Sequence, residues 1–187
     1  MGQVLRSWEQ SPFHENAVRI YTSDHGELLG EHGLWGKGSF HEASVRVPMI
    51  FSAPDRLPEG ARVAEPVGQV NLTPTILDLA GAPPLPNATG RSFLEALTSS
   101  SGPWPGPVLA EQGGRAPSRM VRDGKWKYVH YLGHEDELYD LDRDPDELCN
   151  LAADPAQAET RSRLRAMLFS DGWDPHRVLA QLEHRKP

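Results

Sequence analysis

The sequence of 187 residues predicts an α/β fold that continues into a small α+β subdomain with an antiparallel hairpin. Three observations lead to this prediction. Residues 17–22 alternate in a β-rich pattern and run into a polar loop rich in glycine. Residues 71–80 have the apolar spacing of a helix that stops at Gly81. Asp123-Gly124 lies between two β-rich runs, which is typical of a tight hairpin turn.

The first part of the chain alternates between helices and strands. Residues 1–9 have helical spacing, and residues 17–22 predict the first strand. Residues 47–52 predict a second strand, and residues 71–80 a helix with Pro74 in its first turns. Because α/β sheets bind ligands at the carboxyl ends of their strands, we expect a functional site in the loop after the first strand.

Residues 98–118 are rich in Ser, Gly and Pro, so we expect a boundary there. We divide the chain into residues 1–105, the end of an α/β domain, and residues 106–187, a small α+β subdomain. The elements expected in the second part are the hairpin strands 119–122 and 126–131, a strand at 137–141, and helices at 155–169 and 176–184.

Composition argues against several classes of function. The net charge of −7 disfavours nucleic acid held by bulk electrostatics. No apolar run reaches the roughly 18–20 residues of a membrane span. Residues 1–10 lack the apolar stretch of a signal peptide, so the chain as written is expected in the cytoplasm, while the compartment of the protein stays unknown. The single Cys149 excludes an internal disulfide and a Cys-rich metal site.

Candidate chemistry is densest between residues 22 and 38. Asp24 beside His25 offers a carboxylate and an imidazole to a divalent cation, and Gly26 lets the backbone turn sharply after them. Lys37, in a loop flanked by glycines, could return to the same pocket as a point charge for an anion. A plain loop and a solvated lysine are the alternative interpretation.

Four segments of the sequence carry recognisable motifs in a fixed order. Residues 21–48 carry Ser-Asp-His-Gly-Glu, Leu-Gly-Glu-His-Gly and Trp-Gly-Lys, and the other segments are residues 70–81, 121–128 and 137–152, the last with Glu-Leu-Tyr-Asp-Leu. Together they resemble the sulfatase family of the alkaline-phosphatase-like fold. The resemblance covers nearly the whole chain. It implies the C-terminal part of a sulfatase sheet followed by the small α+β subdomain.

The resemblance also implies a function. Asp24 and His25 would be metal ligands, and Lys37 would contact the sulfate oxygens of a sulfuric ester during its hydrolysis. The cofactor would be a divalent metal, with Ca²⁺ expected and Mn²⁺ or Mg²⁺ as alternatives. The partner would be a sulfated small molecule or carbohydrate. His32 and His41 are candidates for lining the pocket, with ordinary loop histidines as the alternative.

The nucleophile of that family has no counterpart in this sequence. The family uses formylglycine, made from Cys or Ser in Cys/Ser-x-Pro-Ser-Arg, upstream of the metal motif. The run from Arg115 to Arg119 contains Pro-Ser-Arg, but Arg115 stands at the nucleophile position, so we interpret the match as chance. We therefore predict a sulfatase fragment without a catalytic residue of its own, inactive alone, with formylglycine only in an upstream segment.

Alternatives remain open from the sequence. A phosphonate or phosphodiester hydrolase shares the Asp-His-Gly pattern, and a non-catalytic pseudoenzyme remnant would also lack the nucleophile. A sheet without its N-terminal strands would expose apolar surface, so we expect self-association of the isolated chain. Asn71 stands where the family commonly has Asp, and the sequence offers no functional reason for the difference.

Overall fold

A computed structural model describes residues 2–99, 104, 106–114 and 116–184 of the chain. The chain forms two compact units. The first unit comprises residues 1–27, 46–64 and 69–105, and the second comprises residues 28–45, 65–68 and 106–187. The predicted domain division between residues 105 and 106 stays a prediction, and Pro105 lies outside the described residues.

The first unit is built on a two-stranded antiparallel sheet and short helices. Strand β1 (Arg19–Thr22) pairs with β4 (Met49–Ser52), which confirms both predicted strands with shorter bounds. The helical elements are α1 (Gly2–Glu9), η1 (His14–Asn16), η3 (Gln69–Asn71), α3 (Leu72–Leu79) and α4 (Leu94–Thr98). Tyr21 and Ile50 are cross-strand partners and are 47 % and 57 % exposed. This is the apolar surface on which the predicted self-association depends, and the self-association itself stays a prediction.

Asn71 has a structural role at the start of α3. Its Nδ2 donates to the main-chain oxygen of Arg91 at 2.9 Å, and its own main-chain oxygen accepts from Thr75 Oγ1 at 2.8 Å. Thr75 Oγ1 in turn accepts from the N–H of buried Phe93 at 3.1 Å. An ionised aspartate has no N–H to donate to Arg91. The amide at this position therefore holds the residue 91 segment against α3.

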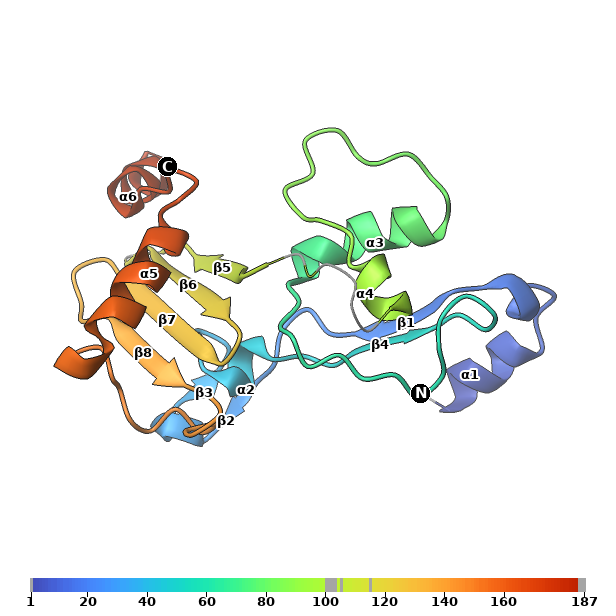
Figure 1. Ribbon diagram of the computed structural model, residues 1–187, viewed down its shortest axis with the longest axis horizontal. Coiled ribbons are helices and arrows are strands. Elements are labelled where there is room, and N and C mark those ends of the chain that lie inside the picture. The colour runs from blue at the N-terminus through green and yellow to red at the C-terminus, as the bar shows by residue number, and fades with distance from the viewer. Residues whose placement is uncertain (1, 100–103, 105, 115, 185–187) are drawn as a thin grey trace. The chain divides into compact units, whose positions relative to one another are not determined.

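The second unit contains a four-stranded antiparallel sheet, in the order β5-β6-β7-β8 (Figure 1). Its strands are β5 (Val108–Gln112), β6 (Ser118–Asp123), β7 (Trp126–Tyr131) and β8 (Glu137–Asp140). The predicted hairpin is confirmed, with Asp123 opposite Trp126 and Gly124 at φ 56°. Strand β5 was not expected, because it lies inside the Ser-, Gly- and Pro-rich stretch 98–118 that we interpret as a boundary.

The predicted C-terminal helices are also confirmed. The first begins with a 3₁₀ turn, η4 (Pro155–Gln157), and continues as α5 (Ala158–Leu168), while the second is α6 (Pro175–Glu183). Asp154 and Asp174 accept main-chain hydrogen bonds from the first turns, as N-caps do. Among the described residues, no helix is long and apolar enough to cross a membrane.

Two layers cover the two faces of the four-stranded sheet. Helix α5 lies across one face, as Figure 1 shows, and its Leu164 and Leu168 are fully buried against Val121, Tyr128 and Leu138. The core of the other face is formed by Phe40, Met120 and Val129. Phe40 comes just before the short helix α2 (Glu42–Val45), which follows the hairpin β2 (Leu28–Leu29) and β3 (Trp35–Gly36). The segment 28–45 therefore packs on the sheet that lies much later in the chain.

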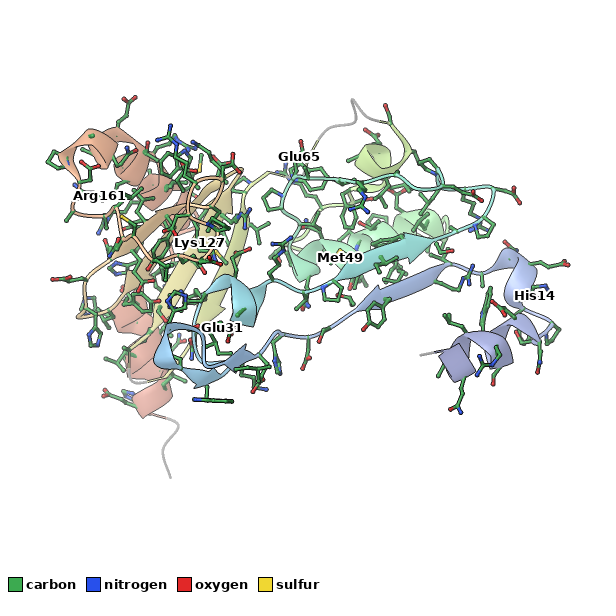
Figure 2. All side chains as sticks on the ribbon, turned by 90° about the horizontal axis from the view of Figure 1, so that it is seen from below. His14, Glu31, Met49, Glu65, Lys127 and Arg161 are labelled. Atoms are coloured by element: carbon green, nitrogen blue, oxygen red, sulfur yellow. The ribbon has the colours of Figure 1, made fainter. Side chains whose placement is uncertain are left out.

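A buried lysine joins this second layer to the sheet. Lys127, labelled in Figure 2, lies in β7 with none of its surface exposed. Its Nζ donates to the main-chain oxygen of Phe40 at 2.9 Å and to Glu147 Oε1 at 2.7 Å. It also pairs with Glu42 Oε1 at 2.6 Å, and Glu42 pairs with Arg122 at 3.0 Å. The ammonium group thus has three acceptors, two from the residue 28–45 segment and one from the segment after β8.

Lys127→Met should lower the free energy of unfolding by about 3–5 kcal/mol, because it leaves buried carboxylates without their cation. Urea-induced unfolding of the purified protein measures the change. Arg143→Ala is the control, since Arg143 is 85 % exposed and lies 3.9 Å from Asp140, and it should cost less than about 1 kcal/mol. Equal stability of Lys127→Met and the wild type would contradict a structural role for the buried pair.

Candidate functional site

The loop that leaves β1 holds the predicted ligand pair Asp24 and His25. Ser23 Oγ donates to the main-chain oxygen of His25 at 3.0 Å, and the His25 N–H donates to Asp24 Oδ1 at 3.0 Å. Gln69 donates from its side chain to the main-chain oxygens of Ser23 and Asp24. These bonds fix the loop locally, so the two side chains are presented by an ordered turn.

The donor atoms of this pair suit a divalent cation. Asp24 Oδ2 and His25 Nε2 lie 3.3 Å apart. Adjacent ligands of one divalent ion lie about 3.0–3.4 Å apart when the bonds are 2.1–2.4 Å long. His25 Nδ1 lies 2.7 Å from the main-chain oxygen of Gly26, so we assign the proton to Nδ1 and the lone pair to Nε2. The N–H of His25 lowers the pKa of Asp24, which keeps this exposed carboxyl charged.

Lys37 lies in the loop between β3 and α2 and is exposed. Its main-chain oxygen accepts a hydrogen bond from the buried Ser44 Oγ at 3.0 Å, which ties the loop to α2. Asp24 and His25 belong to the first unit, whereas Lys37 belongs to the second. The roles of these three residues as metal ligands and sulfate contact stay predictions.

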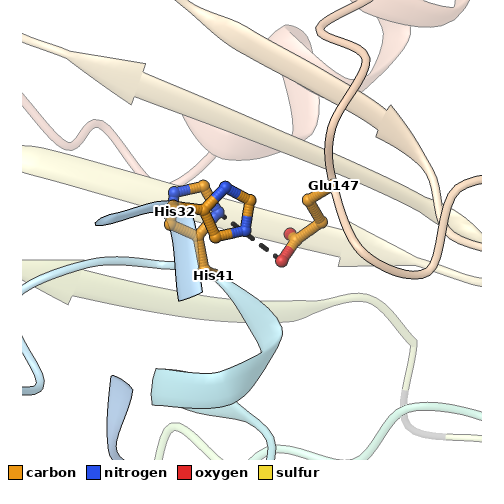
Figure 3. A group of neighbouring side chains, drawn as sticks. All are labelled: His32, His41 and Glu147. Atoms are coloured by element: carbon orange, nitrogen blue, oxygen red, sulfur yellow. Dashed lines mark ion pairs between the residues drawn. The ribbon is translucent and has the colours of Figure 1, made fainter. Parts of the chain in front are cut away.

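His32 and His41 come together in the second unit. Their rings stack with centroids 3.7 Å apart and planes 7° from parallel (Figure 3). His32 belongs to the turn η2 (Glu31–Gly33), where its φ is 55°, and His41 immediately precedes α2. Glu147, in the segment after β8, faces them with Oε2 3.6 Å from His41 Nδ1. The three side chains offer ligand atoms within 4.8 Å of one another.

Glu147 is buried and ionised. Burial by itself would raise its pKa, but the His41 imidazole, the Lys127 ammonium and the N–H of Glu42 hold that pKa at about 2. Neither Glu147 nor Lys127 was predicted from the sequence as a site residue. One signal was present: strand alternation puts Lys127 on the same face as Val129, and a charge on an apolar face needs a buried partner.

A family model covers most of the chain. The model described as N-sulphoglucosamine sulphohydrolase, C-terminal, matches residues 30–171. The chain belongs to the sulfatase family. This confirms the resemblance inferred from the four ordered segments.

Sulfatase relatives match the chain over most of its length. Arylsulfatase K of Mus musculus is 35 % identical over 170 residues, which are 82 % of this chain and 30 % of the relative. Choline-sulfatase of Rhizobium meliloti (strain 1021) is 34 % identical over 182 residues, which are 93 % of this chain and 35 % of the relative. The chain therefore spans about a third of the length of these curated relatives.

Solved structures confirm the predicted fold class, an alkaline-phosphatase-like sulfatase fold. A 2-O GAG sulfatase superposes with a TM-score of 0.83 at 30 % identity, covering 99 % of this chain and 42 % of its own. The phosphonate monoester hydrolase of Agrobacterium radiobacter superposes with a TM-score of 0.79 at 28 % identity, covering 90 % of this chain and 37 % of its own.

The run that resembles the sulfatase nucleophile motif serves the fold. Arg119, at its end, donates from Nη1 and Nη2 to the two carboxylate oxygens of Asp171 at 2.7 and 2.6 Å. Arg119 Nη1 also donates to the main-chain oxygen of Leu168 at 2.9 Å. This bidentate pair joins β6 to the end of α5. Arg115, at the nucleophile position, lies outside the described residues.

Asp171→Asn should make the protein less sensitive to acid. Arg119 holds the pKa of Asp171 at about 2, below its ordinary value of 3.8. A carboxyl whose pKa is lowered by folding stabilises the protein above about pH 3.8 and loses that contribution as the pH falls to about 2. The free energy of unfolding should therefore fall less steeply in this window for the variant than for the wild type. The difference in slope should correspond to less than one proton, because solvent screens the half-exposed carboxylate of Asp171.

Urea unfolding at several pH values between 2 and 5 measures this slope. Asp146→Asn removes an exposed carboxylate from the same unit and is the matched control. Identical slopes for Asp171→Asn and the wild type would show that the Arg119 pair does not act in solution.

Proposed function

We propose that this chain supplies the C-terminal part of the active site of a sulfuric ester hydrolase. In this proposal, Asp24 and His25 hold a divalent metal and Lys37 contacts the sulfate group. The observation that carries the proposal is the Asp24–His25 pair, whose ligand atoms lie 3.3 Å apart, with His25 Nδ1 2.7 Å from the main-chain oxygen of Gly26. Family membership supports the reaction class.

The chemistry follows from these donors. A divalent metal, when bound, supplies Lewis-acid polarisation of the anionic ester. The lowered pKa of Asp24 keeps the carboxylate ready to bind a cation, and His25 offers an imidazole nitrogen beside it. The ammonium of Lys37 offsets negative charge on the transferring group. We infer Ca²⁺ as the ion, with Mn²⁺ or Mg²⁺ as alternatives, and we place His32 and His41 near the pocket wall.

The inferred substrate is a sulfated carbohydrate or a sulfated small molecule. One relative is named choline-sulfatase, and one neighbouring structure is a 2-O GAG sulfatase. Another neighbour, 25 % identical with a TM-score of 0.82, was solved with its substrate D-glucosamine-2-N,6-O-disulfate. Because the sequence has no Cys/Ser-x-Pro-Ser-Arg run, the nucleophile would come from residues outside this sequence, and the chain alone would be inactive.

Asp24→Ala in the full-length protein should reduce kcat/KM for an aryl sulfate by at least about a hundredfold, because it removes a metal ligand. It should also reduce the metal content measured by atomic emission. Glu27→Ala removes another exposed carboxylate from the same loop and should leave both quantities close to wild type. Unchanged turnover in Asp24→Ala would overturn the assignment.

A phosphonate or phosphodiester hydrolase is the second candidate function. The structural similarity of the chain to two phosphonate monoester hydrolases, at 28 % and 27 % identity, supports this candidate. We expect the full-length protein to have a higher kcat/KM for an aryl sulfate than for an aryl phosphonate monoester. The reverse order, measured with the same leaving group, would replace the first candidate with the second. No turnover of either ester by metal-loaded protein would favour a pseudoenzyme.

A further inference from the structure

His41 carries a buried nitrogen with an unmet bonding need. Its Nδ1 is buried and has no hydrogen-bond partner among the described residues. Glu147 Oε2 faces it at 3.6 Å, beyond the usual range of a hydrogen bond. A buried polar atom without a hydrogen-bond partner is energetically costly, so we expect a ligand that bonds to His41 Nδ1.

The gap between these two atoms has the size of a metal coordination edge. Two ligands of one tetrahedral Zn²⁺ with bonds of 2.0–2.1 Å lie about 3.3 Å apart. The separation of 3.6 Å between His41 Nδ1 and Glu147 Oε2 is within a few tenths of an ångström of this value. A small approach of the two side chains would place both on one ion.

His32 supplies the third donor. Its ring now lies parallel to that of His41, and parallel rings cannot both aim an in-plane lone pair at one ion, so binding requires the His32 ring to tilt. His32 is exposed, and Gly30 and Gly33 with positive φ flank its turn. The residue that must move is therefore His32, which lies on the surface. Figure 3 shows its ring lying against the ring of His41.

The surroundings hold the carboxylate in place. Glu147 Oε1 accepts from Lys127 Nζ at 2.7 Å, and Oε2 accepts from the Glu42 N–H at 2.6 Å. Such outer partners orient a ligating carboxylate. The carboxylates of Glu42 and Glu147 balance the charges of Lys127 and Arg122. Two imidazoles and one carboxylate suit Zn²⁺ and similar transition metals better than Ca²⁺.

We propose that His32, His41 and Glu147 bind a divalent transition-metal ion of the zinc class, in addition to any ion at Asp24 and His25. Water completes the coordination on the exposed side. The bound ion joins the residue 28–45 segment to the segment after β8, and it adds a cross-link to the one that Lys127 already makes. The proposal requires no catalytic activity of the protein.

Titration of the full-length protein with Zn²⁺ by calorimetry, and with Co²⁺ by visible absorption, tests the proposal. His41→Phe keeps an aromatic ring and removes the donor, so it should weaken Zn²⁺ binding at this site at least about tenfold and abolish the intense tetrahedral Co²⁺ bands. His32→Asn should do the same to a lesser degree, and asparagine tolerates the positive φ of this turn. His134→Asn changes an exposed histidine of the same unit and should bind like the wild type.

The double variant Asp24→Ala/His25→Ala separates this site from the proposed catalytic metal. It should retain the Zn²⁺ affinity and the Co²⁺ bands assigned here while losing sulfatase turnover. If His41→Phe does not fold, as judged by its thermal transition without metal, His32→Asn carries the test. Unchanged Zn²⁺ affinity and Co²⁺ bands in the folded histidine variants would overturn the proposal, whatever the turnover of the protein.

Discussion

A buried cation organises the second unit of this sulfatase chain. Lys127 has none of its surface exposed, and such a charge is tolerated only when hydrogen-bonded carboxylates surround it. Its partners are Glu147 Oε1, Glu42 Oε1 and the main-chain oxygen of Phe40. Phe40 and Glu42 precede the sheet in the sequence, and Glu147 follows it. The hydrogen bonds and ion pairs of Lys127 therefore hold both segments against the sheet.

The segment 28–45 depends on this anchoring. Its regular structure consists of two strands of two residues each, a 3₁₀ turn of three residues and a helix of four residues, too little to be stable by itself. Phe40 packs into the core of the sheet, Glu42 pairs with Lys127, and Ser44 holds the main chain of Lys37. The position of Lys37, the predicted sulfate contact, thus follows from packing on the C-terminal sheet.

Predictions from the sequence were correct where the signal is local. Asp154 before a proline marks the start of the η4–α5 helical segment, and Asp123-Gly124 marks the hairpin. Asp24 and His25 are neighbours in sequence, so their proximity needs no fold, and their role as metal ligands stays a prediction. Strand β5 was missed because tertiary pairing with β6 overrides its loop-like surroundings. Glu147 was missed because its bond to Glu42 joins residues 105 positions apart, and no short-range pattern encodes such a contact.

The ionic cluster also solves a main-chain problem that an apolar core could not. A helix of four residues leaves its first N–H groups without intrahelical acceptors, and the carbonyl of buried Phe40 just before it needs a donor. Glu147 Oε2 accepts the Glu42 N–H, and Lys127 Nζ donates to the Phe40 carbonyl. Replacing Lys127 and Glu147 with apolar side chains of similar volume would remove the buried charges but leave both main-chain groups unpaired in the core. The main-chain hydrogen bonds that Lys127 and Glu147 make therefore offset the desolvation cost of their charges. This explains why a salt bridge occurs at a position where strand alternation predicts an apolar residue.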